Sequence, residues 1–162
     1  GLDDARAHRG RDAERVAEDQ DHGLALLRVY GPRKLSPLAL GANPPRKGDL
    51  TLVGIPDPKE QNGAKRLTEI KARLADNNAI ELLQPVPMAG FSGAAAIDTQ
   101  GQVLGMMEMR NFVLASTEPA APPVRLVTSE TIRSFLTGHN VPPAATGGDA
   151  RSAVVRIICV RK

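Results

Sequence analysis

Hydrophobic residues along this chain fall mostly into short groups separated by glycine, proline and asparagine. Apolar groups of about four to eight residues between such turn-forming residues are typical of β-strands. The continuous apolar run Leu24–Leu27 is typical of a strand that is buried on both faces, and Thr99–Gly101 has the composition of a hairpin turn. The pattern predicts a mostly β fold, with strands at 13–19, 23–29, 50–55, 79–84, 94–98, 102–109 and 123–127.

Two segments carry helical signals. Leu67, Ile70 and Leu74 recur at the spacing of an amphipathic helix, so the local pattern of 64–75 favours a helix. A clearer helix begins near Thr128, because Thr128 or Ser129 can accept hydrogen bonds from the free N–H groups of a first turn. Glu130 suits the positive end of that helix dipole, and Gly138 ends the helix.

The two ends of the chain differ from its middle. Residues 1–12 are charged and without period, which indicates a disordered end or the remnant of a preceding segment. Residues 139–152 have the composition of a linker. The apolar tail 153–162 predicts a strand, with its apolar run at 153–160, that pairs with a sheet. The chain begins at Gly1 without an initiator methionine or a signal peptide, so we expect a fragment or a trimmed domain.

Composition excludes several function classes. The 162 residues are enough for one domain, or slightly more, and with 2% aromatic residues the core must be aliphatic. The net charge of +3 is mild, and no basic block interleaves with aromatic residues, so we expect no nucleic-acid binding. No apolar run approaches the ~20 residues of a membrane span.

Cysteine and histidine, the residues most often used for metal binding and redox chemistry, are few in this chain. Cys159 is the only cysteine, so neither an internal disulfide nor a cysteine-based zinc cluster is possible, and we expect an inert buried thiol. His8, His22 and His139 lie far apart and show no metal-ligand spacing. The sequence therefore predicts no metal and no cofactor.

The segment most suggestive of chemistry is Gly90-Phe91-Ser92-Gly93, followed by Ala94. A serine flanked by glycines in a tight loop can expose its hydroxyl group, and neighbouring backbone N–H groups can form an oxyanion hole. Ala94 occupies the position of the last glycine in the α/β-hydrolase elbow, so that motif is not met. Taken alone, the tetrapeptide is equally compatible with a simple turn between two strands.

The order of features resembles the trypsin-like serine peptidases, in particular their HtrA-like bacterial branch. The resemblance covers about residues 13–137, and 64–75 is a strand in that family, so we expect a strand there despite the helical spacing. The resemblance implies the second of the two β-barrels of the trypsin-like fold, part of the first barrel, a C-terminal helix and a tail strand. Residues 13–138 would form one partial peptidase domain. The segments that carry it are Gly23–Val29, Pro37–Gly41, Gly48–Leu50, Val53–Pro56, Gly90–Gly93, Val103–Met107 and Leu126–Leu136.

The resemblance also implies a site for a peptide or protein substrate. Ser92 would be the nucleophile, and the N–H groups of Gly90 and Ser92 would form the oxyanion hole. Val86 would form the base of the primary specificity pocket, where it would favour a small or aliphatic side chain. Glu108, Met109 and Arg110 would form the pocket wall and pair with an extended peptide. Alternatively, Glu108 and Arg110 face solvent, and the nearby Met107 belongs to the core.

The departures from the family pattern concern the rest of the catalytic triad. Gly23 occupies the position of the catalytic aspartate, and Asp21, two residues earlier, is a candidate for that role from a remodelled turn. The family's histidine lies in a first barrel, in an A-A-H context that this chain lacks, and we expect His8 and His22 to be surface or turn residues. Without a base, Ser92 is a poor nucleophile.

Three functional hypotheses follow. In the first, a preceding barrel supplies the histidine to the full-length protein, which hydrolyses peptides through Ser92, while this chain alone is inactive. In the second, the chain is a pseudo-peptidase that binds extended peptides or partner proteins without catalysis. In the third, the module is structural and its tail strand mediates assembly. By resemblance alone, the expected location is periplasmic or secreted.

Overall fold

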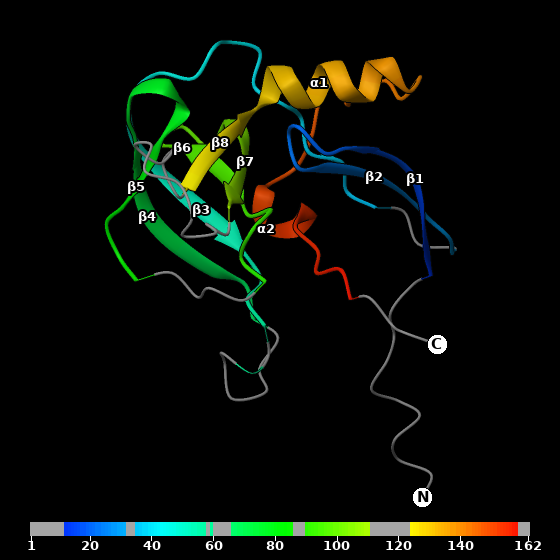
Figure 1. Cartoon of the computed structure of the whole chain (residues 1–162), viewed down its shortest axis with the longest axis horizontal. Coiled ribbons are helices and arrows are strands. Elements are labelled where there is room, and N and C mark those ends of the chain that lie inside the picture. The colour runs from blue at the N-terminus through cyan, green and yellow to red at the C-terminus, as the bar shows by residue number, and fades with distance from the viewer. Residues whose placement is uncertain are drawn as a thin grey trace, which may run out of the picture. The chain divides into compact units, whose positions relative to one another are not determined.

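The computed structural model describes residues 12–31, 35–57, 59, 66–85, 90–110 and 124–158. The chain divides into two compact units, residues 1–35 and 36–162. Both units are built mainly from antiparallel strands, so the predicted mostly β fold is confirmed (Figure 1). No helix in the described ranges has the length and hydrophobicity needed to cross a membrane.

The first unit is a β-hairpin. Strands β1 (Ala13–Asp19) and β2 (Leu24–Val29) pair antiparallel on either side of a turn in which Gly23 has φ +64°. The prediction that Leu24–Leu27 is buried on both faces is wrong, because Leu24 is buried but Ala25 is exposed. A two-stranded sheet has too few side chains to cover both of its faces.

The second unit is a nearly closed six-stranded barrel. Its strand order is β5-β4-β3-β6-β7-β8, and each neighbouring pair is antiparallel. A bridge between Ala79, next to β5, and Arg125 of β8 brings the two edge strands together. The strands are β3 (Gly48–Gly54), β4 (Thr68–Leu74), β5 (Ile80–Leu82), β6 (Ala95–Asp98), β7 (Val103–Met109) and β8 (Val124–Thr128), with the short 3-10 helix η3 (Asp76–Asn78) between β4 and β5.

The ambiguous segment 64–75 contains a strand, as the family resemblance predicted. In β4, the buried residues Ile70, Ala72 and Leu74 alternate with exposed Glu69, Lys71 and Arg73. The helical spacing of Leu67, Ile70 and Leu74 was therefore misleading, because two of these three residues also satisfy the period of a strand.

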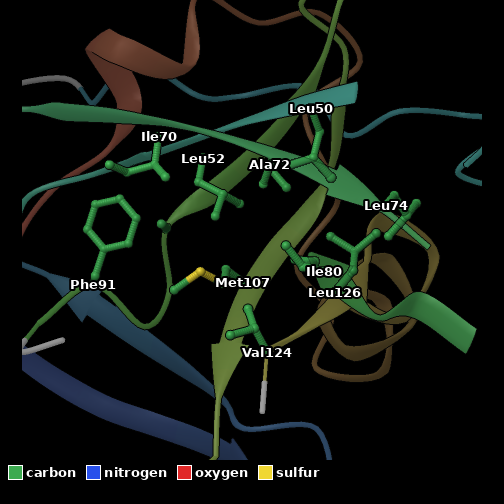
Figure 2. Close-up of a cluster of buried hydrophobic side chains, with 12 residues drawn as sticks. Leu50, Leu52, Ile70, Ala72, Leu74, Ile80, Phe91, Met107, Val124 and Leu126 are labelled. Atoms are coloured by element: carbon green, nitrogen blue, oxygen red, sulfur yellow. The ribbon is translucent and has the colours of Figure 1, made fainter. Parts of the chain in front are cut away.

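The barrel interior is filled by one main cluster of buried side chains. Figure 2 shows Phe91 among these side chains, on the same side of the cluster as Ile70 and Leu52. Every strand of the barrel contributes, so the cluster ties the sheet together. Its buried members are Leu50, Leu52, Ile70, Ala72, Leu74, Ile80, Phe91, Ala94, Ala96, Met107, Val124 and Leu126.

The predicted C-terminal helix of the peptidase fold is α1 (Ser129–Gly138). Thr128 caps it, because the Thr128 Oγ1 accepts a hydrogen bond from the Thr131 N–H at 3.2 Å. The buried Ser129 hydroxyl donates to the Val103 carbonyl at 2.6 Å, which fixes the start of the helix to β7. The helix ends at Gly138, as predicted.

The tail differs from its prediction. Residues Ala150–Ala153 form a short helix, α2, capped by Asp149, and residues 154–158 belong to no strand. The predicted tail strand is therefore wrong over 153–158, while Cys159 and the residues after it lie outside the described part. This segment is held by side-chain packing and not by strand pairing. Ala150 and Val154 pack on a second apolar cluster that includes Val53.

The segment before α2, predicted as a linker, also packs on the barrel unit. The Gly148 N–H donates to the Pro37 carbonyl at 3.2 Å. A Cβ added to Gly147 would lie 2.3 Å from the Ala39 nitrogen, so these two backbones are in close contact.

Candidate active site

The loop that carries Ser92 lies between β5 and β6 and depends on two glycines. Gly90 and Gly93 have φ of +74° and +94°, a left-handed conformation that favours glycine. Between them the chain reverses direction, so that Phe91 is fully buried while Ser92 is exposed. The sequence Gly-Phe-Ser-Gly thus holds a serine on the surface over an apolar anchor.

Gly54 at the end of β3 makes room for that anchor. A Cβ at Gly54 would lie 2.8 Å from Phe91 Cε2 and 3.0 Å from the Ala94 Cβ. The ring therefore lies directly against the β3 backbone and fills the end of the main cluster. Sequence reasoning assigned no role to Phe91, although an aromatic residue between two glycines in a chain this poor in aromatics was a usable signal.

Strand β7 holds the other side of the loop. The Gly93 N–H donates to the Met107 carbonyl at 2.8 Å, and the Met107 N–H donates to the Ala94 carbonyl at 2.8 Å. The Met109 N–H donates to the Ser92 Oγ at 3.2 Å. The structure therefore brings two of the sequence-predicted site residues, Ser92 and Met109, into direct contact.

The end of β7 extends past its partner strand β6, and there the Ser92 loop covers its edge through the hydrogen bonds to Met107 and Met109. The pairing between β6 and β7 ends at Ala95 and Met106, whereas the pairing between β7 and β8 continues to Met109. On the Ser92 side, the last residues of β7 thus extend beyond β6. An extended peptide that added to this edge would take the place of the Ser92 Oγ at the Met109 N–H.

The two backbone N–H groups predicted to form the oxyanion hole belong to Gly90 and Ser92. Across the described ranges, neither the Gly90 N–H nor the Ser92 N–H donates a hydrogen bond to another residue. Exposed N–H donors next to a serine hydroxyl are what an oxyanion hole requires. The role of these two N–H groups as an oxyanion hole stays a prediction.

Glu108 and Arg110, which were predicted to form the pocket wall with Met109, pair with each other. The Glu108 carboxylate, with a side chain 18% exposed, accepts a hydrogen bond from the Arg110 Nε at 3.4 Å. The two residues flank Met109 in the sequence, so the end of β7 carries one negative and one positive side chain. Met107 is buried in the core, as the alternative reading held. Val86 lies outside the described residues.

The described histidines have partners other than Ser92. In the barrel unit, the His139 Nδ1 donates to the Phe135 carbonyl at 2.8 Å. In the hairpin unit, the His22 Nδ1 donates to the Asp19 carboxylate at 2.7 Å. The His22 hydrogen bond holds the pKa of Asp19 below its ordinary value. Asp21 lies in the same turn as His22, and its suggested catalytic role stays a prediction.

Sequence reasoning missed one ion pair near the loop, between the tail and the end of β3. Arg156 donates to the Pro56 carbonyl at 2.7 Å and to the Asp57 carboxylate at 3.0 Å. The pKa of Asp57 lies below its ordinary value, first because the Lys59 N–H donates to this carboxylate and second because Arg156 does. No sequence signal links residues about a hundred positions apart, so only the fold could reveal this contact.

These features define a trypsin-like fold with an exposed serine on a glycine-rich loop, and comparison with known proteins gives the same class. The family described as "Trypsin-like peptidase domain" matches residues 3–106, and the chain belongs to this family. A search of curated proteins finds no significant match.

Two similar solved structures are of Rv3671c from M. tuberculosis. One is an inactive form with a serine-to-alanine mutation. It is 25% identical with a TM-score of 0.50, and the match covers 83% of this chain and 68% of that chain. The other, described as a protease in its active form, is 22% identical with a TM-score of 0.51, and the match covers 90% of this chain and 64% of that one. The second likeness shows the fold alone.

Proposed function

We propose that this chain carries the nucleophile part of a serine peptidase site. Ser92 is the nucleophile, and the N–H groups of Gly90 and Ser92 stabilise the oxyanion that forms when the hydroxyl attacks a peptide carbonyl. Family membership supports the reaction class. The observation that carries the assignment is the loop itself, where an exposed serine stands beside two N–H groups with no partner among the described residues.

We further propose that this chain alone does not hydrolyse peptides. Gly23 replaces the aspartate expected before the Leu-Ala-Leu-Leu run, and His22 and His139 donate to other groups. In the full-length protein, a preceding barrel supplies the general base to Ser92. Removing the base and its aspartate partner leaves only the residual rate that comes from the oxyanion hole and binding.

The proposed substrate is an extended peptide or protein segment. Its backbone pairs with the end of β7 at Glu108, Met109 and Arg110, where the strand extends beyond β6. The side chain before the scissile bond enters a pocket based on Val86 and is small or aliphatic, since an apolar base offers no partner to a charge. The proposed location, periplasmic or secreted, comes from the HtrA-like resemblance alone.

One observation favours a second function, a pseudo-peptidase that binds without catalysis. Within the described residues, the Ser92 Oγ accepts a hydrogen bond from the Met109 N–H, a backbone group of the proposed substrate-binding strand. In this alternative, Ser92 closes the edge of β7 until a peptide displaces it, and the site serves as a receptor for extended segments.

Labelling with a fluorophosphonate probe separates the two functions. The peptidase proposal predicts that the full-length protein labels, that Ser92→Ala abolishes labelling and that the 162-residue chain alone labels far more slowly. Ser134→Ala is the matched control, because Ser134 is an exposed serine of α1 and its loss should leave labelling intact. A full-length protein that binds peptides but never labels would establish the pseudo-peptidase instead.

A further inference from the structure

The tail reaches back to the segment that supports the Ser92 loop. Through two nitrogens of one guanidinium group, Arg156 binds the Pro56 carbonyl and the Asp57 carboxylate. The Arg156 and Asp57 side chains are 22% and 31% exposed, so this pair is better shielded from water than the Arg15–Glu18 pair at 66% and 42%. A planar guanidinium with two partners fixes orientation as well as distance.

The Asp57 backbone, in turn, lies against Gly90. A Cβ added to Gly90 would be 3.2 Å from the Asp57 nitrogen and 3.7 Å from the Pro56 carbonyl carbon. The peptide that joins Pro56 to Asp57 is therefore in contact with the first residue of the Ser92 loop. Arg156 donates one hydrogen bond to the carbonyl oxygen of this peptide bond, which belongs to Pro56. It donates a second to the side-chain carboxylate of Asp57, the residue that follows.

We propose that Arg156 is a positioning residue for the oxyanion hole. It holds the Pro56–Asp57 peptide against Gly90, and this support fixes the direction of the Gly90 N–H relative to Ser92. Phe91 anchors the loop from inside the barrel and β7 holds its Gly93 side by hydrogen bonds, whereas Arg156 supports its Gly90 side from the tail. This inference rests on the proposed role of the Gly90 N–H, but the support itself is measurable without catalysis.

The test measures backbone order by ¹⁵N relaxation in the 162-residue chain. In Arg156→Met, which keeps an unbranched apolar stem, the order parameter of Gly90 should fall from about 0.85 to about 0.6 or below. Gly101, another left-handed glycine in the β6–β7 turn, should keep its value. Arg151→Met is the matched control, because Arg151 lies in α2, just before the tail, but pairs with Asp149 and Glu69.

Each outcome decides the proposal. An unchanged Gly90 in Arg156→Met overturns it, and so does an equal loss of order at Gly90 and Gly101, which would show only a general loosening. If Arg156→Met does not fold, Arg156→Lys replaces it, with a smaller decrease expected at Gly90 because a lysine lacks the two-pronged geometry. Fluorophosphonate labelling tests Ser92 separately, so failure of one idea leaves the other standing.

Discussion

The substitution Phe91→Ala tests whether the Ser92 loop is anchored in the barrel core. Phe91 has no exposed surface, and its ring lies in contact distance of the Gly54 position. Alanine would leave a cavity at one end of the main cluster, where β3 and β7 meet the loop (Figure 2). The loop would then lose its only buried side chain between Gly90 and Gly93.

The expected cost is large relative to the stability of a domain. Truncation of a buried phenylalanine to alanine destabilises proteins by about 3–5 kcal/mol, the sum of lost transfer energy and a cavity term. Domains of this kind are stable by about 5–15 kcal/mol. A loss of that size lowers the midpoint of thermal unfolding by roughly 6–20 °C at about 2–4 °C per kcal/mol.

Urea unfolding followed by circular dichroism measures this cost. Leu83→Ala is the matched control, because Leu83 is 53% exposed and its truncation should cost less than about 1 kcal/mol. Phe91→Leu should recover part of the loss, since leucine fills much of the cavity. A cost for Phe91→Ala no larger than that of Leu83→Ala would refute the anchor.

Three further predictions concern the frame around the site. Gly105→Ala should destabilise the barrel by at least about 2 kcal/mol in urea unfolding, because φ is +151° and a Cβ would lie 1.9 Å from the Val127 carbonyl oxygen; a neutral effect would contradict the close approach. Thr128→Ala should cost about 1 kcal/mol by thermal unfolding, because α1 loses its cap, whereas Thr128→Ser should cost little. Because the pKa of Asp57 is lowered in the folded state, its carboxylate stabilises the fold above its unfolded pKa, and this contribution is lost as pH falls below about 4. The difference in stability between the wild type and Asp57→Asn should therefore shrink from pH 6 to pH 3, and a constant difference would contradict the linkage.

The individual strands and the helix α1 could be predicted from local patterns, whereas their closure into a barrel was implied by the family resemblance. The hairpin of β6 and β7 has two apolar segments around one turn, and Thr128 to Gly138 has a cap, an amphipathic body and a glycine end. The segment at 64–75 shows where local pattern fails. Its apolar residues fit the spacing of a helix as well as the alternation of a strand. The pairing of β4 with β3 and β5 decides in favour of the strand.

The tail and the supports of the site could not be predicted, for a physical reason. The apolar residues at 153–160 predict a buried strand, but Val155, Ile157 and Ile158 are exposed, and a capped helical turn and the contacts of Arg156 hold the described part of the segment. Ser92 was recognisable because its neighbours in sequence are also its neighbours in the site. Gly54, Asp57 and Arg156 act on the loop through space, so their roles appear only in the folded chain.

The most direct test of the central claim is to map the adduct that a peptidyl fluorophosphonate forms with the full-length protein. If Ser92 is the nucleophile, mass spectrometry should find the added mass on the peptide that contains Gly90 to Gly93, and Ser92→Ala should remove it. An adduct on another serine, or none on a protein that still hydrolyses peptides, would contradict the account.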